Sequence, residues 1–161
     1  MDDSELKRQP KVAFVGIGNP FRGDDGVGHR IFELIRKKYP QFGSYLIQDD
    51  FSPLLVIFEQ YPLCIIFDAI QADAPPGTIV EKDLLNDSLQ ELEIFSTSSH
   101  HLSLAQMLEL AREMDVLPEA VHLLGIVGKN FNLGDPMHPA VQAAMDVAIR
   151  RCEQLLAVHL A

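Results

Sequence analysis

Two adjacent carboxylates, Asp24 and Asp25, occupy a glycine-rich segment that follows an apolar run from Val12 to Val15. Glycine lets a backbone adopt positive φ and approach a ligand closely, and a helix starting near Gly26 would hold the carboxylates at its positive end. Carboxylates there suit a cation better than a phosphate. The dinucleotide-binding pattern fails, because Phe21 stands where its third glycine belongs. The structural alternative is that the aspartates only cap the next helix.

Two further candidate ligands follow other expected elements. Asp68 ends the apolar run 63–67, and His100 and His101 directly precede an expected helix. Two carboxylates and one imidazole form a mixed oxygen and nitrogen set that suits a divalent ion such as Ni²⁺, Zn²⁺ or Mn²⁺, with coordination positions left open. The alternatives are that Asp68 only forms a turn and that the histidines lie exposed beside a serine cap.

The elements that must position these residues alternate between strand and helix. This alternation predicts an α/β fold, a three-layer α/β/α arrangement with a mostly parallel central sheet. Ligands of such sheets bind at the carboxyl ends of strands, where Asp25, Asp68 and one of the histidines, His100 or His101, are expected to meet. We expect strands at 12–16, 45–48, 63–67, 78–81 (an edge strand) and 121–127, and helices at 27–39, 53–61 with Ser52 as its cap, 104–114 and 141–155. The acidic segment 83–93 is expected to be a loop with a helical turn.

Length and composition favour one α/β domain at 12–161 behind a polar lead at 1–11, since 161 residues with 47% apolar content can bury a core unaided. The formal charge of −10 opposes binding to nucleic acid or to an anionic membrane. Without a signal peptide or a spanning apolar run, the expected location is the cytoplasm. Cys64 and Cys152 lie in apolar patterns and are expected to be small buried hydrophobes.

Three motifs together resemble the hydrogenase maturation endopeptidases, which trim a C-terminal peptide from the large subunit of nickel-iron hydrogenases. The resemblance implies a twisted, mainly parallel sheet between helices, of the phosphorylase/hydrolase-like type. It also implies that Asp25, Asp68 and His100, not His101, are the metal-binding residues. The motifs are Gly16-x-Gly18-Asn19 followed by Asp24-Asp25-Gly26-x-Gly28, the strand closing in Asp68-Ala69, and His100-x-Leu102-x-Leu104.

The same resemblance implies a substrate, the large-subunit precursor already loaded with nickel, and a metal that serves for recognition. Zinc or cadmium in a crystal would then stand in for nickel. Gly18, Asn19 and Asp24 are expected to contribute to substrate binding, although Asn19 could equally fix the turn. Asp24 could orient a water or cap the helix, of which we favour the cap. The sequence identifies no general base.

The chain departs from the family pattern at two places. Many members carry an aspartate followed by small residues where this chain has 49–52, Asp-Asp-Phe-Ser, and a proline is frequent within 125–128, Gly-Ile-Val-Gly. The segment 128–134 is expected to be a mobile surface connection.

Two other functions remain open. Residues 15–20 resemble the opening of bacterial peptidyl-tRNA hydrolases, although the resemblance ends at Pro20 and the acidic charge suits tRNA badly. A nickel-binding assembly factor that recognises the precursor without cutting it is the second.

Overall fold

The computed structural model describes residues 11–87 and 99–160, and in the second range it describes side chains from Ser103 onward. The polar lead up to residue 10, and the part of the acidic segment beyond residue 87, lie outside the described residues. In chain order the elements are β1 (Val12–Ile17), the 3₁₀ helix η1 (Gly23–Gly26), α2 (Val27–Lys38), β2 (Gly43–Ile47), α3 (Pro53–Gln60), β3 (Leu63–Ile70), β4 (Ile79–Asp83), α5 (Ser99–Glu113), β5 (Ala120–Val127) and α6 (Pro139–His159).

These strands form a five-stranded sheet in the order β2-β1-β3-β5-β4. β1 pairs in parallel with β2 and β3, β3 pairs in parallel with β5, and β4 lies antiparallel at the edge beside β5. Every residue of β1 and β3 is buried, as continuous apolar runs in a covered parallel sheet require. The predicted mostly parallel α/β sheet is therefore confirmed, with the edge strand at Ile79–Asp83 instead of 78–81.

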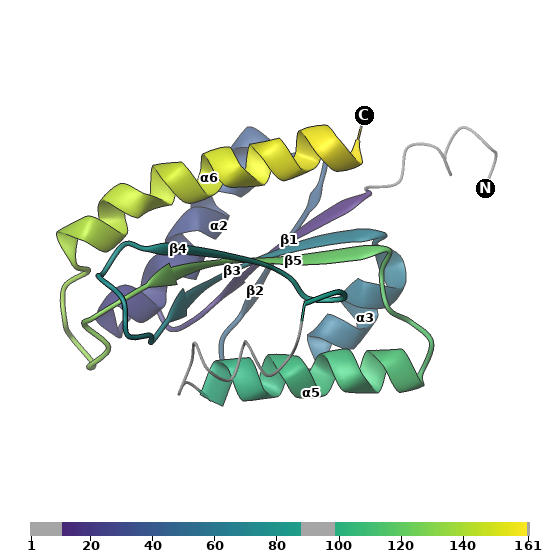
Figure 1. Cartoon of the computed structure of the whole chain (residues 1–161), viewed down its shortest axis with the longest axis horizontal. Helices are drawn as coiled ribbons and strands as arrows, with labels where there is room; N and C mark the ends of the chain where they lie inside the picture. Colours follow the sequence, from purple (N-terminus) through teal and green to yellow (C-terminus); the bar gives the residue numbers. More distant parts are fainter. Residues whose placement is uncertain (1–10, 88–98, 161) are drawn as a thin grey trace.

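Helices cover both faces of the sheet. In Figure 1, α2 and α6 lie on one side and α3 and α5 on the other. The side chains of β3 alternate accordingly: Ile65 and Phe67 join the core shared with α2 and α6, whereas Cys64 and Ile66 join the core shared with α3 and α5. This alternation determines which layer faces each residue at the strand's carboxyl end.

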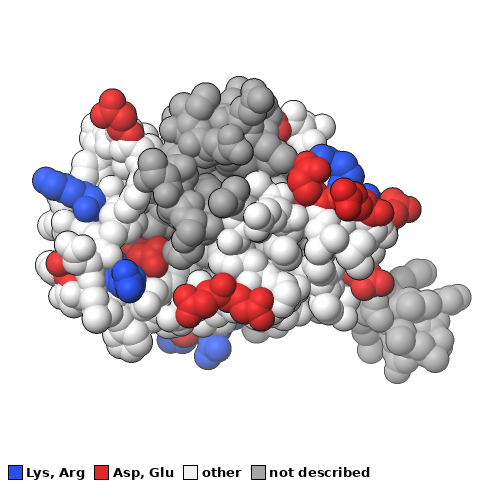
Figure 2. All heavy atoms as spheres, turned by 90° about the horizontal axis from the view of Figure 1, so that it is seen from below, with Lys and Arg blue, Asp and Glu red and all other residues white. Residues whose placement is uncertain are grey.

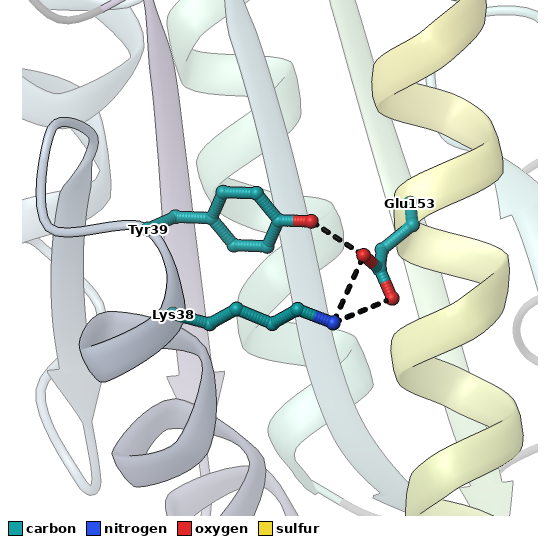
Figure 3. Close-up of polar contacts among 3 residues, drawn as sticks. All are labelled: Lys38, Tyr39 and Glu153. Carbon is teal, nitrogen blue, oxygen red and sulfur yellow. Dashed lines mark hydrogen bonds and ion pairs between the residues drawn. The ribbon is translucent and has the colours of Figure 1, made fainter.

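A polar cluster joins the end of α2 to α6. Figure 3 shows the Lys38 ammonium and the Tyr39 hydroxyl converging on the Glu153 carboxylate, with Nζ to Oε1 at 3.0 Å and the Tyr39 hydroxyl to Oε2 at 2.5 Å. The hydrogen bond to Glu153 is the main cause that raises the pKa of Tyr39 to about 12. The cluster therefore links α2, which follows η1, to α6, which follows the loop after β5.

Ser52 precedes α3 and was predicted to cap it. Ser52 is the N-cap residue of α3 and Pro53 lies in its first turn, as predicted, although Ser52 has helical φ and ψ of −58° and −30° and its side chain makes no capping hydrogen bond. The backbone amide of Ser52 donates to the Asp50 carboxylate at 3.0 Å.

The expected burial of Cys64 and Cys152 is confirmed, since both have no exposed surface.

Two imidazoles meet between β5 and the end of α6. The Nε2 atoms of His122 and His159 lie 2.9 Å apart, and His122 is only 9% exposed. Burial is the largest influence on His122 and lowers its pKa below 6.5, and the His159 ring acts in the same direction. The nearby Asp83, Glu81 and Asp87 carboxylates act oppositely without reversing the shift.

This shift predicts that acid weakens the fold. The unfolded chain takes up a proton at His122 once the pH falls below about 6.5, whereas the folded chain resists until its lower pKa is reached. The free energy of unfolding, from urea denaturation, is expected to decrease between about pH 7.5 and about pH 5.5. The His122→Gln protein should lose part of that decrease. A wild-type free energy that rises as the pH falls across this interval would contradict the argument.

The surface carries the acidic excess of the sequence. On the face seen from below in Figure 2, Asp and Glu side chains form several separate groups, whereas Lys and Arg lie toward the margins. Such a surface repels polyanions. Among the described residues, no helix combines the length and the apolar content that crossing a bilayer requires.

Candidate metal centre

Asp25 lies in η1, beyond the carboxyl end of β1, and is 7% exposed. The backbone amide of Asn19 donates to the Oδ2 atom of Asp25 at 2.9 Å. Gly18 has φ of +136°, and a Cβ there would collide with the carbonyl oxygen of Asp25. The glycine is therefore required both by conformation and by close backbone approach, and together these contacts hold Asp25 at the sheet edge.

Asp68 is a residue of β3 itself and is 1% exposed. Because side chains alternate along a strand, Asp68 follows Cys64 and Ile66 toward the face covered by α3 and α5. The start of α2 packs tightly here, since a Cβ on Gly28 would lie 2.7 Å from the carbonyl oxygen of Phe67. η1 also contacts β3. The elements that carry the two carboxylates are thus packed against each other at one edge of the sheet.

His100 is in the first turn of α5. Figure 1 shows that α5 begins at the end of the molecule where the parallel strands have their carboxyl ends, and on the face toward which Asp68 points. The side chains of His100 and His101 lie outside the described residues. Among the residues described, no three His, Cys, Asp or Glu side chains gather into a metal-binding group. All three ligands, Asp25, Asp68 and His100, therefore stay predictions.

Asp24 anchors a distant loop. The amides of Lys129 and Asn130 donate to its Oδ2 atom, and the amide of His138 to its Oδ1 atom, each at 2.7 Å. The amide of Asp24 donates in turn to the carbonyl oxygen of Asn130 at 2.7 Å. Neither η1 nor α2 receives a side-chain capping bond, so the favoured cap role is wrong.

The same contacts revise the expectation for the loop before α6. The segment 128–134 was expected to be a mobile surface connection, yet its backbone is bonded to a fully buried aspartate. The His138 imidazole then caps α6 by accepting from the amide of Ala140 at 3.0 Å. The Pro139 that follows was a sequence signal for this helix start, but no local signal pointed to Asp24 as the partner of the loop.

Asn19 fixes the turn, which is one of its two predicted roles. Its side-chain oxygen accepts from the amide of Phe21 at 2.9 Å. The amide of Gly18 is engaged by the carbonyl oxygen of Ile47 at 3.0 Å. Substrate binding by Gly18, Asn19 or Asp24 stays a prediction.

Neither cysteine is a nucleophile. Both thiols are free, and burial raises the pKa of Cys64 and of Cys152 to about 12. A thiol with that pKa is protonated at neutral pH, whereas a nucleophilic cysteine needs the thiolate. Neither thiol is therefore a candidate for the site at neutral pH.

Comparison with known proteins decides the family. The family model described as HycI, hydrogenase maturation protease, matches residues 51–155. The chain belongs to the hydrogenase maturation protease family. It is 27% identical over 151 residues to the hydrogenase 2 maturation protease of Escherichia coli, covering 91% of this chain and 89% of that protein.

Two solved structures share the fold of this maturation protease. The hydrogenase maturating endopeptidase HybD from E. coli has a TM-score of 0.78 at 22% identity, covering 92% of this chain and 93% of that one. The [NiFe] hydrogenase maturation protease HybD from Thermococcus kodakarensis has a TM-score of 0.77 at 24% identity, covering 90% and 98%.

The predicted family and activity are thus confirmed: this is a metal-dependent endopeptidase of hydrogenase maturation. The matched residues 51–155 include Asp68 and His100 but not Asp25. The assignment of Asp25 depends instead on the geometry of its loop and on its motif.

Proposed function

We propose that this maturation protease removes a C-terminal peptide from the nickel-loaded large-subunit precursor of a nickel-iron hydrogenase, and that Asp25, Asp68 and His100 recognise the nickel. The observation that carries the proposal is the placement of two almost fully buried carboxylates on adjoining elements at the carboxyl edge of the sheet. Carboxylate oxygens are suitable ligands for a divalent cation. Membership of the family supplies the reaction class.

The donor set fits this substrate. Carboxylate oxygens and an imidazole nitrogen are ligands that nickel accepts, and three of them leave coordination positions for groups of the precursor. The ion arrives as cargo of the substrate, and zinc or cadmium would occupy the same donors in its absence. Because the precursor is docked through its metal, the scissile bond is held in one place relative to the enzyme.

Asn19 and Asp24 support this recognition indirectly, through hydrogen bonds that position other groups of the site. The backbone amide of Asn19 orients the Asp25 carboxylate through the 2.9 Å hydrogen bond to Oδ2. Asp24 directs its oxygens to loop amides and is fully buried, so its contribution to substrate binding is indirect.

Processing of loaded and metal-free precursor tests the proposal. The purified enzyme is mixed with each form, and the products are weighed by mass spectrometry. Loss of a C-terminal peptide from the loaded precursor alone is expected, because the metal-free form cannot engage the three ligands. Equal cleavage of both forms would contradict metal recognition.

Two further outcomes of the same experiment would replace the proposal. Binding of the loaded precursor without any change in mass would indicate an assembly factor. Release of peptide from peptidyl-tRNA, offered in a parallel reaction, would indicate the hydrolase alternative.

A further inference from the structure

Two large apolar side chains, Phe21 and Leu133, lie beside the candidate metal centre and are each 71% exposed. They belong to different loops, one before η1 and the other before α6. The amide of Gly134 donates to the carbonyl oxygen of Phe21 at 2.8 Å, which places the two loop tips next to each other. Single exposed apolar residues are common on proteins, but two neighbouring ones on the rim of a site form a surface.

Hydrogen bonds to the Asp24 carboxylate hold the two loops together. Asp24 accepts from the amides at 129, 130 and 138, so one carboxylate holds both ends of the segment that carries Leu133. Hydrogen bonds to an ionised group are stronger than those between neutral groups. Gly23 also packs closely, since a Cβ there would lie 3.0 Å from the Asp135 side chain. The apolar tips are therefore held in place before any partner arrives.

We propose that Phe21 and Leu133 form a docking surface for an apolar segment of the hydrogenase large-subunit precursor, with Asp24 as the positioning residue that keeps the two loops in register. The inference rests on the proposed function, in which the precursor brings its metal to Asp25. Phe21 lies four residues before Asp25, in the loop that leads into η1. Because Asp25 is only 7% exposed, a polypeptide that delivers a metal to it has to contact the surrounding rim.

A second copy of this chain fits the surface less well. Stable dimers bury about 1,200 Å² or more, whereas an aromatic side chain buries about 150–250 Å². Two loop tips cannot supply a dimer interface alone. They can add affinity and orientation to a substrate that is also held through its metal.

Binding and processing by the Phe21→Ser and Leu133→Ser enzymes test the surface. The dissociation constant for nickel-loaded precursor and the KM are each expected to rise about tenfold, and kcat is expected to stay within about twofold. Val158→Ser is the matched control, because Val158 is 74% exposed but lies near the end of α6, away from the carboxyl edge. It should change neither quantity.

The role of Asp24 has its own readouts. In the Asp24→Asn enzyme, hydrogen exchange at the amides of 129, 130 and 138 is expected to accelerate. If Asp24 acts through Leu133, adding Leu133→Ser to Asp24→Asn should raise KM little beyond the value for Asp24→Asn alone. Full additivity of the two changes in KM would overturn the positioning role.

Measuring precursor binding together with cleavage distinguishes a failure of this inference from a failure of the proposed function. Precursor that binds the wild-type enzyme, depends on Phe21 and Leu133, and stays uncut would contradict the proposed function while supporting the surface. Cleavage by the wild-type enzyme, with unchanged binding and KM in both serine variants, would overturn the surface alone. Absence of any binding of the precursor to the wild-type enzyme would overturn both.

Discussion

The Asp68→Asn enzyme is expected to leave nickel-loaded precursor uncut, with processing slowed by at least about a hundredfold. Asparagine keeps the size of the side chain but removes the negative charge and one of the two acceptor oxygens. The ion then loses a charged ligand at the strand end, and the precursor loses its alignment with the enzyme. Asp25→Asn and His100→Ala are expected to have effects of the same size.

The fold should survive this substitution. Asp68 is 1% exposed at the end of a fully buried strand, and a neutral amide is less costly to bury than a carboxylate. The variant is expected to keep a cooperative urea transition, whose midpoint shows how far the fold is affected. This separates a defect in recognition from a defect in folding.

Mass spectrometry of the precursor after a fixed reaction time measures the loss of processing, and His101→Ala provides the control. His101 is the neighbour of a predicted ligand, and its substitution should change the rate by less than about twofold. A folded Asp68→Asn enzyme that cuts loaded precursor at the wild-type rate would remove Asp68 from the site. Full activity of His100→Ala would likewise remove the imidazole.

The sheet could be predicted because its signals are local. The apolar run at 63–67 contains no turn residue, and β3 occupies Leu63–Ile70. The alternation of strands with amphipathic helices predicts parallel pairing, and three of the four strand pairings are parallel. The carboxyl edge follows from that topology, so the packing of η1, which carries Asp25, against β3, which carries Asp68, was predictable in outline.

The roles of individual polar side chains were less predictable, because neighbours in space decide them. Asp24 has the residue type and position of a helix cap, yet the amides that it binds lie more than a hundred residues further along the chain. Ser52 precedes a proline as caps often do, but the Asp50 carboxylate engages its amide first. No pattern of spacing pairs His122 with His159, which meet only after α6 has packed on the sheet.

Gly28→Ala is expected to destabilise the protein strongly and to disturb the metal centre as well. A Cβ on Gly28 would overlap the carbonyl oxygen of Ile17 and lie 2.7 Å from that of Phe67. Both obstacles are backbone atoms of central strands, so α2 has to move away from the sheet. Overpacking of this kind costs about 1–3 kcal/mol, and rigid neighbours place the cost at the upper end. The free energy of unfolding from urea denaturation measures it.

Gly134→Ala separates the effect of this close contact from that of losing a glycine. Gly134 has φ of +84° and no atom within 4 Å of a built Cβ, so alanine there meets conformational strain without a clash. That strain costs about 1–2 kcal/mol. Because α2 directly follows the turn that carries Asp25, Gly28→Ala should also lower kcat/KM for loaded precursor through a displaced carboxylate. Gly28→Ala protein that unfolds at the wild-type urea concentration and processes precursor normally would show that α2 tolerates a shift without moving Asp25.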